Sequence, residues 1–141
     1  MILDTTYFLP IVGIDVEPDI LRACLNGRTI FSIDDVRLSL ISIFELQAKA
    51  VKLGISAERV VRGVRALFRL FDVVEFYRPD IIRTSFELRK NLPDYIDCVI
   101  LATAISLGED LLTEDRLIHS LRYDMKRRYG INIYSYADVL K

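Results

Sequence analysis

The sequence predicts a single α/β domain over residues 1–141, with a central parallel sheet of about five strands and helices on both faces. Two observations lead to this prediction. Short apolar runs rich in Ile, Leu and Val recur along the chain, and a segment with helical spacing follows most of them. Strands that alternate with helices are typical of parallel sheets covered on both faces. A chain of 141 residues is long enough to build the core of one such domain.

The composition excludes several classes of protein. Hydrophobic residues make up 52% of the chain, but charges interrupt every apolar run before the roughly 18 residues that a membrane span requires. No basic residue precedes Asp4, so the N-terminus does not have the pattern of a signal peptide, and we expect a soluble cytoplasmic protein. The formal net charge of -1 argues against a generally basic nucleic-acid binder. The high apolar content favours an interface with a second copy or another partner.

The first predicted strand is the apolar run at residues 1–3, which ends at Asp4. Proline and glycine interrupt the segment that follows, so no regular element is predicted there. The next predicted element is a helix at residues 19–26, because Pro18 stands at its start and Gly27 just past its end.

The second predicted strand is the run at residues 36–41, which is rich in apolar residues. A helix is predicted to follow at residues 42–53, with Gly54 as its C-terminal stop. The spacing of Ser42 and Glu45 is that of a capping box, which predicts that this helix begins at Ser42.

A third helix is predicted to begin at Ser56, since apolar residues recur at helical spacing up to Phe71. The interleaved arginines are expected to form a solvated face; they are Arg59, Arg62, Arg65 and Arg69. A third strand is predicted around residues 73–76. Pro79 then opens a helix at residues 80–90.

The most apolar helix of the chain is predicted between Pro93 and Gly108, with Ile100, Leu101 and Ala104 in the core. Its start is acidic, because Asp94 and Asp97 lie three residues apart on one helical face. The remaining predicted elements are a strand at 110–113, a helix at 122–128 ended by Gly130, a strand at 131–134 and a helical turn at 137–140.

Four acidic residues fall where strands end or the following helices begin. Asp4 ends the first strand, and Glu45 lies in the first turn of the helix after the second. Asp97 lies in the first two turns of the central helix, and Asp115 lies just past the fourth strand. The carboxyl ends of parallel strands meet at one edge of a sheet, so these acids are expected to converge. Clustered carboxylates repel one another unless a cation neutralises them, and their oxygens suit Mg²⁺ or Mn²⁺.

Each of these acids also has a purely structural interpretation. Asp4 suits a turn after a strand, Glu45 a capping box, and Asp115 a helix N-cap. Asp94, unlike Asp97, is not in register with Asp4, Glu45 and Asp115. We therefore interpret it as a negative charge that stabilises the helix N-terminus. Lys49 either pairs with Glu45 one turn earlier or faces a phosphate.

Other polar residues carry weaker signals. His119 is the single histidine, which argues against a His-rich zinc site or a Ser-His-Asp triad, and we expect it at the surface. Cys24 and Cys98 are expected to be buried free thiols. Glu114 is expected to be solvated, and Arg116 is a candidate for phosphate binding. The basic run at Lys126, Arg127 and Arg128 either caps a helix C-terminus or binds phosphate.

Four short segments carry a resemblance to a known family. They are Ile2-Leu3-Asp4-Thr5-Thr6, Ser42-Ile43-Phe44-Glu45-Leu46, Asp97-Cys98-Val99-Ile100-Leu101-Ala102-Thr103-Ala104 and Leu112-Thr113-Glu114-Asp115-Arg116-Leu117. In this order and spacing they resemble the PIN-domain family, in particular the small toxins of VapBC-type toxin–antitoxin pairs. One departure is Leu117, where many members carry an aromatic residue.

The resemblance implies a single PIN-like domain that acts as a Mg²⁺- or Mn²⁺-dependent endoribonuclease. It implies that Asp4, Glu45, Asp97 and Asp115 are both catalytic and metal-binding, and that the Thr113 hydroxyl orients ligands or water. It further implies an RNA substrate and a cognate antitoxin protein. The excess of apolar residues predicts a homodimer.

Two alternatives compete with this hypothesis. One is a non-catalytic PIN-like module that keeps its acids for stability or metal binding and acts through protein or RNA partners. The other is a phosphatase or receiver domain that uses Asp4. A haloacid-dehalogenase-type phosphatase needs a second Asp two residues after the first, and Thr6 stands there instead.

Overall fold

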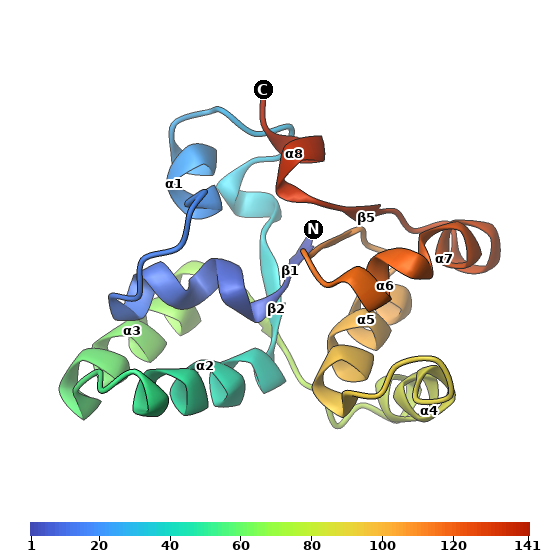
Figure 1. Ribbon diagram of the computed structural model, residues 1–141, viewed down its shortest axis with the longest axis horizontal. Helices are drawn as coiled ribbons and strands as arrows, with labels where there is room; N and C mark the ends of the chain where they lie inside the picture. The colour runs from blue at the N-terminus through green and yellow to red at the C-terminus, as the bar shows by residue number, and fades with distance from the viewer.

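The computed structural model describes residues 1–141 and contains a five-stranded, all-parallel sheet with the order β3-β2-β1-β4-β5 (Figure 1). The strands are short: β1 Ile2–Leu3, β2 Arg37–Ser39, β3 Asp72–Val74, β4 Leu111–Leu112 and β5 Ile133–Tyr134. The chain adds strands on one side of β1 up to β3 and then continues on the other side with β4. The strand order therefore reverses at β1, and ligand sites of open α/β sheets lie outside the carboxyl ends of strands at such a point.

The helices follow the strands as the sequence predicts. They are α1 Ile20–Leu25, α2 Leu40–Lys52, α3 Ala57–Leu70, α4 Pro79–Leu88, α5 Tyr95–Leu107, α6 Arg116–Ser120, α7 Arg122–Tyr129 and α8 Tyr136–Val139. Two 3₁₀ segments, η1 Thr5–Val12 and η2 Ile33–Asp35, complete the chain. None of the helices is both long and apolar enough to cross a membrane.

Helices cover both faces of the sheet, which confirms the predicted fold class. Successive strand residues point to opposite faces, so Ile2 and Leu3 enter two different cores. Ile2 packs with residues of α4, α5 and α7, whereas Leu3 packs with residues of η1, α1, α2 and α3. Figure 1 shows these two groups of helices on either side of the strands. Both cysteines are free and buried, as predicted.

The central helix α5 forms as predicted, and local chemistry sets both of its ends. The Asp94 carboxylate accepts a hydrogen bond from the Ile96 amide at 2.8 Å and caps the N-terminus. Gly108 ends the helix in a left-handed conformation (φ 64°) that favours glycine. Ile100, Leu101 and Ala104 are completely buried.

The start of α2 differs from the prediction. Strand β2 ends at Ser39, and the Ser39 hydroxyl accepts a hydrogen bond from the Ile41 amide as the N-cap of α2. The predicted strand at residues 36–41 is therefore too long, and the capping box of Ser42 with Glu45 is wrong. Ser42 lies inside the helix, and Glu45 occupies its second turn rather than its first.

The 3₁₀ segment η1 is a second feature that the sequence does not predict. It begins directly after Asp4, contains Pro10 and ends at Gly13. Its apolar residues are buried against α2 and α3, where Gly63 permits a close approach to the backbone of Ile11. Tertiary packing therefore stabilises the 3₁₀ conformation of η1, although its proline and glycine led us to predict no regular element there.

Candidate active site

A cavity of about 290 Å³ opens at the carboxyl edge of the sheet, and all four predicted acids line it. In Figure 1 the N-terminal parts of α2 and α5, which carry Glu45 and Asp97, lie near each other beyond the end of β1. The lining residues are Asp4, Thr6, Tyr7, Glu45, Lys49, Asp97, Glu114 and Asp115. We refer to this space as the acidic cavity.

Asp4 is held by both of its carboxylate oxygens. Oδ1 accepts a hydrogen bond from the Thr5 amide at 2.7 Å, and Oδ2 accepts one from the Thr113 hydroxyl at 2.6 Å. The Thr113 oxygen in turn accepts a hydrogen bond from the Asp115 amide at 3.1 Å. Thr113 is completely buried and so connects the end of β1 to the turn after β4. The family resemblance implied that this hydroxyl orients ligands or water, and in the structure it donates to the carboxylate of Asp4.

Glu45 and Lys49 enter the acidic cavity from α2. Their side chains are 19% and 39% exposed, and Lys49 Nζ lies 3.9 Å from Glu45 Oε1. A hydrogen bond between two buried hydroxyls, Thr5 Oγ1 to Ser42 Oγ at 2.9 Å, fixes α2 against the end of β1. Ser42 therefore helps to position Glu45 through this contact, instead of through the predicted capping box.

The structure separates the two acids at the start of α5. Asp94 is the N-cap and does not line the acidic cavity, which confirms its interpretation as a helix-terminus residue. Asp97, the third residue of α5, lines the cavity and is half-buried.

Asp115 serves its structural role and lines the cavity at the same time. Its Oδ1 accepts a hydrogen bond from the Ile118 amide at 2.8 Å and caps α6. The other carboxylate oxygen makes no hydrogen bond within the protein. The N-cap interpretation and a site role are therefore compatible.

Burial, together with repulsion between neighbouring carboxylates, raises the pKa of two acids in the acidic cavity. Burial, followed by the charges of Asp4, Asp94, Asp115 and Glu45, raises the pKa of Asp97 to about 7. Burial also raises the pKa of Asp4, assisted by Glu45 and opposed by the hydrogen bonds from Thr113 and Thr5 and by the charge of Lys49. Such shifts mark carboxylates that are gathered without enough positive charge to offset them.

The donor set fits a hard divalent cation, since Asp4, Glu45, Asp97 and Asp115 offer only carboxylate oxygens. The side chains stand apart in this arrangement, because no three acidic, histidine or cysteine residues are already positioned around one point where an ion could sit. Coordination of one ion by several of them together therefore requires side-chain rotation.

The sequence did not identify Tyr7 as a residue of the cavity, nor the contacts of Glu114. The Tyr7 hydroxyl and the Tyr136 amide both donate to Glu114 Oε1 at 2.6 Å, which joins η1 and α8 to the turn after β4. Burial and the hydrogen bond to Glu114 raise the pKa of Tyr7. Glu114 is exposed as expected, yet it is held in place and lines the cavity. No sequence pattern identifies this contact, because it joins residues more than a hundred positions apart.

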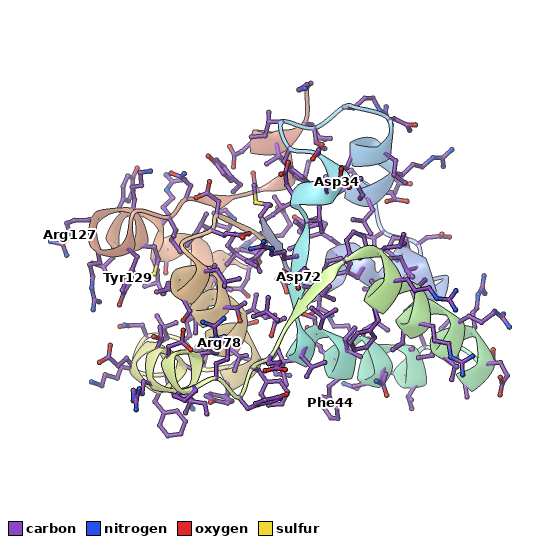
Figure 2. The ribbon with its side chains drawn as sticks, turned by 180° about the vertical axis from the view of Figure 1, so that it is seen from behind. Asp34, Phe44, Asp72, Arg78, Arg127 and Tyr129 are labelled. Atoms are coloured by element: carbon purple, nitrogen blue, oxygen red, sulfur yellow. The ribbon has the colours of Figure 1, made fainter.

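The other basic and imidazole groups lie outside the cavity. Arg116 is exposed at the start of α6 and is not among the lining residues. His119 is half-buried, with Nε2 2.8 Å from the Thr113 carbonyl oxygen, so it is less exposed than expected. Arg127 and Arg128 pair with Asp124 on α7, and Figure 2 shows Arg127 extending away from the body of the molecule.

Solved structures similar to this chain come from toxin–antitoxin complexes. VapBC2 from Rickettsia felis bound to a promoter DNA fragment matches with a TM-score of 0.61 and 17% identity, over 95% of this chain and 96% of the other. A toxin–antitoxin complex from Klebsiella pneumoniae gives 0.61 and 21%, over 92% and 93%. FitAcB from Neisseria gonorrhoeae gives 0.63 and 20%, over 94% and 95%. At these identities the likeness shows the fold alone.

A comparison with curated protein sequences finds no match. The model of the PIN domain family, whose members are generally nucleases, matches residues 1–122. That range includes all four acids and the other residues that line the acidic cavity. The chain therefore belongs to the PIN domain family.

Proposed function

We propose that the protein is a Mg²⁺- or Mn²⁺-dependent endoribonuclease and the toxin of a toxin–antitoxin pair. The observation that carries the proposal is the convergence of Asp4, Glu45, Asp97 and Asp115 on one cavity, where the pKa of Asp97 rises to about 7. The burial and mutual repulsion that raise this pKa cost stability, and bound divalent cations would offset that cost. Membership of a family of nucleases supports the same reaction class.

Asp4, Asp97 and Asp115 are the residues that would hold one or two divalent ions, and Glu45 would bind a second ion or position the attacking water. When bound, such ions lower the pKa of water and offset the charge on the scissile phosphate. The chain itself orients these groups. Thr113 fixes Asp4 and the backbone of Asp115, and the contact between Thr5 and Ser42 fixes the helix that carries Glu45.

A cognate antitoxin and a homodimer complete the proposal. The similar solved structures are toxin–antitoxin complexes, which supports a protein partner. An apolar groove of about 410 Å³, lined by Leu40, Ile41, Ile43, Phe44, Gln47 and Phe76, has the character of a surface that takes an extended or helical segment. Figure 2 shows Phe44 projecting from α2 away from the protein. We place the protein in the cytoplasm, where RNA substrates are found.

The test is cleavage of a mixed RNA substrate by the purified protein, with Mn²⁺ or with excess EDTA. We expect cleavage with Mn²⁺, and none with EDTA or in Asp97→Asn. Asp94→Asn is the matched control: it removes a carboxylate from the same helix, and Asn caps helices as well as Asp, so activity should persist. Cleavage that continues in EDTA and in Asp97→Asn would contradict the proposal. Mn²⁺ binding without cleavage of any RNA would instead favour a non-catalytic module.

A further inference from the structure

The acidic cavity has a strongly uneven charge balance. Five carboxylates line it, and Lys49 is the one basic residue among the lining side chains. An RNA phosphate is itself an anion, so five carboxylates alone would repel the substrate. Metal ions offset part of this charge, but the protein's own contribution at the cavity is a single ammonium group.

Lys49 is free to contact a second group. Its ammonium lies 3.9 Å from Glu45, which is longer than a hydrogen bond, so its N–H donors are not committed to that carboxylate. Its side chain is 39% exposed, about twice the exposed fraction of Glu45. Lys49 is therefore more accessible to an entering ligand than Glu45, and its flexible four-carbon stem lets the ammonium move with that ligand.

The other cations near the site are less well placed. Arg116 follows Asp115 but does not line the cavity. Lys52, one turn further along α2, is exposed and also outside the lining. Lys49 is thus the basic side chain that a phosphate would meet on entering.

We propose that Lys49 binds a backbone phosphate of the RNA at the mouth of the acidic cavity and is a substrate-binding residue distinct from the metal ligands. The inference rests on the proposed function. The competing role is structural: an i,i+4 pair that merely holds Glu45 in place. The two roles predict different measurements, because a phosphate contact acts on RNA affinity and a positioning contact acts on metal affinity.

The experiment measures RNA binding in an Asp97→Asn background, so that the RNA is not consumed, with Mn²⁺ present and at several salt concentrations. Lys49→Met should weaken binding about tenfold, the scale of a hydrogen bond to a charged group. The slope of log affinity against log salt should fall by about 0.7, the value for one phosphate contact with a single strand. Lys49→Arg keeps the charge and should retain most of the slope. Lys52→Met removes an equal charge from the same helix and should change neither quantity.

Two further readouts separate the possible outcomes. In the otherwise wild-type enzyme Lys49→Met should raise KM with little change in kcat, and calorimetry should show Mn²⁺ affinity within about twofold of the parent. Unchanged RNA affinity and slope, or equal effects from Lys49→Met and Lys52→Met, would overturn the inference while cleavage by the parent enzyme stands. A parent enzyme that neither binds nor cleaves RNA would overturn the proposed function, and this inference with it.

Discussion

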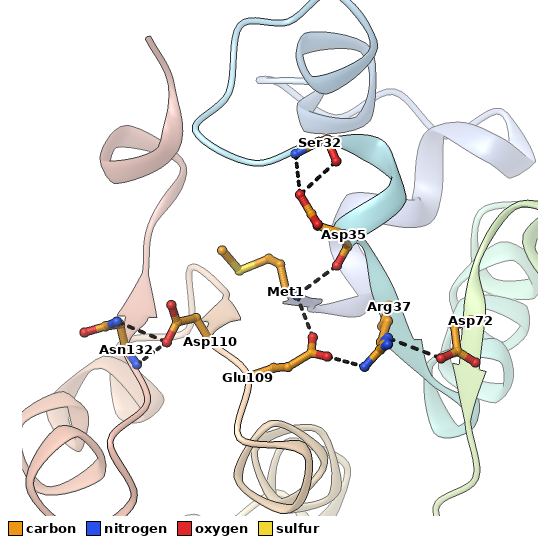
Figure 3. A network of polar contacts seen from close by, with 8 residues as sticks. All are labelled: Met1, Ser32, Asp35, Arg37, Asp72, Glu109, Asp110 and Asn132. Carbon is orange, nitrogen blue, oxygen red and sulfur yellow. Dashed lines mark hydrogen bonds and ion pairs between the residues drawn. The ribbon is translucent and has the colours of Figure 1, made fainter.

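The two edges of the parallel sheet differ in whether their carboxylates are paired with cations. At the carboxyl edge, five carboxylates and one lysine line the acidic cavity, and the pKa of Asp97 is raised to about 7. At the amino edge the carboxylates have partners. Figure 3 shows Glu109 between the amino group of Met1 and Arg37, with Arg37 also reaching Asp72.

At the amino edge, ion pairs and hydrogen bonds link positive and negative groups in one continuous network. The Met1 amino group donates to Glu109 at 2.6 Å and to the Asp35 carbonyl at 2.8 Å, and Arg37 Nε lies 3.2 Å from Asp72. Hydrogen bonds from Ser32 hold the pKa of Asp35 below its usual range. The network joins β1, β2, β3 and the turn before β4, so its charges stabilise the sheet.

The two edges differ in how the pKa values of their carboxyl groups shift. The pKa values of Asp35 and Asp97 shift in opposite directions. Burial and then the neighbouring carboxylates raise the pKa of Asp97, whereas hydrogen bonds from Ser32 lower that of the exposed Asp35. Carboxylates that are buried and repel one another reduce stability, and such perturbed groups are typical of functional sites, in keeping with the proposed role of the acidic cavity. Variants at the two edges should therefore fail in different ways.

The largest expected effect is on metal affinity, from Thr113→Val. This change removes the hydroxyl that donates to Asp4 and accepts from the Asp115 amide. Mn²⁺ affinity, measured by calorimetry, should fall about tenfold, as is typical when a group that orients a ligand is lost. Thr103→Val is the control, because that buried hydroxyl donates only to the Val99 carbonyl within α5. Equal Mn²⁺ affinity in the two variants would show that Thr113 does not orient the site.

Arg37→Met should act on stability and leave the metal site unchanged. It removes the cation that pairs with Glu109 and Asp72. Because Arg37 is partly exposed, we expect a loss of about 1 kcal/mol in the free energy of unfolding. That corresponds to a fall of roughly 3 °C in Tm. Arg83→Met, at an exposed arginine of α4, should change Tm less. A drop in Mn²⁺ affinity for Arg37→Met would contradict the view that the amino edge acts on stability alone.

The smallest expected effect is on the pH dependence of stability without metal. The pKa of Asp97 is about 7 in the folded protein and near 3.8 when unfolded, so the folded state holds an extra proton between these values. Stability should therefore fall as pH rises from about 4 to 7, the opposite of the effect of a carboxyl with a lowered pKa. Burial of Asp4 acts in the same direction.

Thermal melts in EDTA at pH 5, 6, 7 and 8 test this dependence. Asp97→Asn should flatten the decline and raise Tm at pH 8 by about 2 °C. Asp110→Asn is the matched control, because Asp110 already has hydrogen bonds from Asn132. A wild-type curve with the same slope as Asp97→Asn would show that repulsion in the acidic cavity is not significant.

Much of the fold could be predicted because helix ends depend on local chemistry. Ser56 caps α3, and Gly108 and Gly130 end their helices in the left-handed conformation, as their sequence positions indicate. The start of α2 could not be predicted in this way, because both Ser39 and Ser42 are acceptable caps. The register of β2 with β3, in which Ser39 pairs with Val74, extends the strand to Ser39 and selects that residue as the cap.

The sequence by itself identified the four candidate acids and placed them after strands or within the first two turns of helices. It also assigned Asp94 a separate role at a helix terminus. These follow from periodicity and capping, which act over a few residues. Only the tertiary structure decided the strand order, the 3₁₀ form of η1, the link from Tyr7 through Glu114 to α8, and the entry of Lys49 into the acidic cavity. The physical reason is that these features depend on contacts between distant residues, which appear only when the sheet brings its strand ends together.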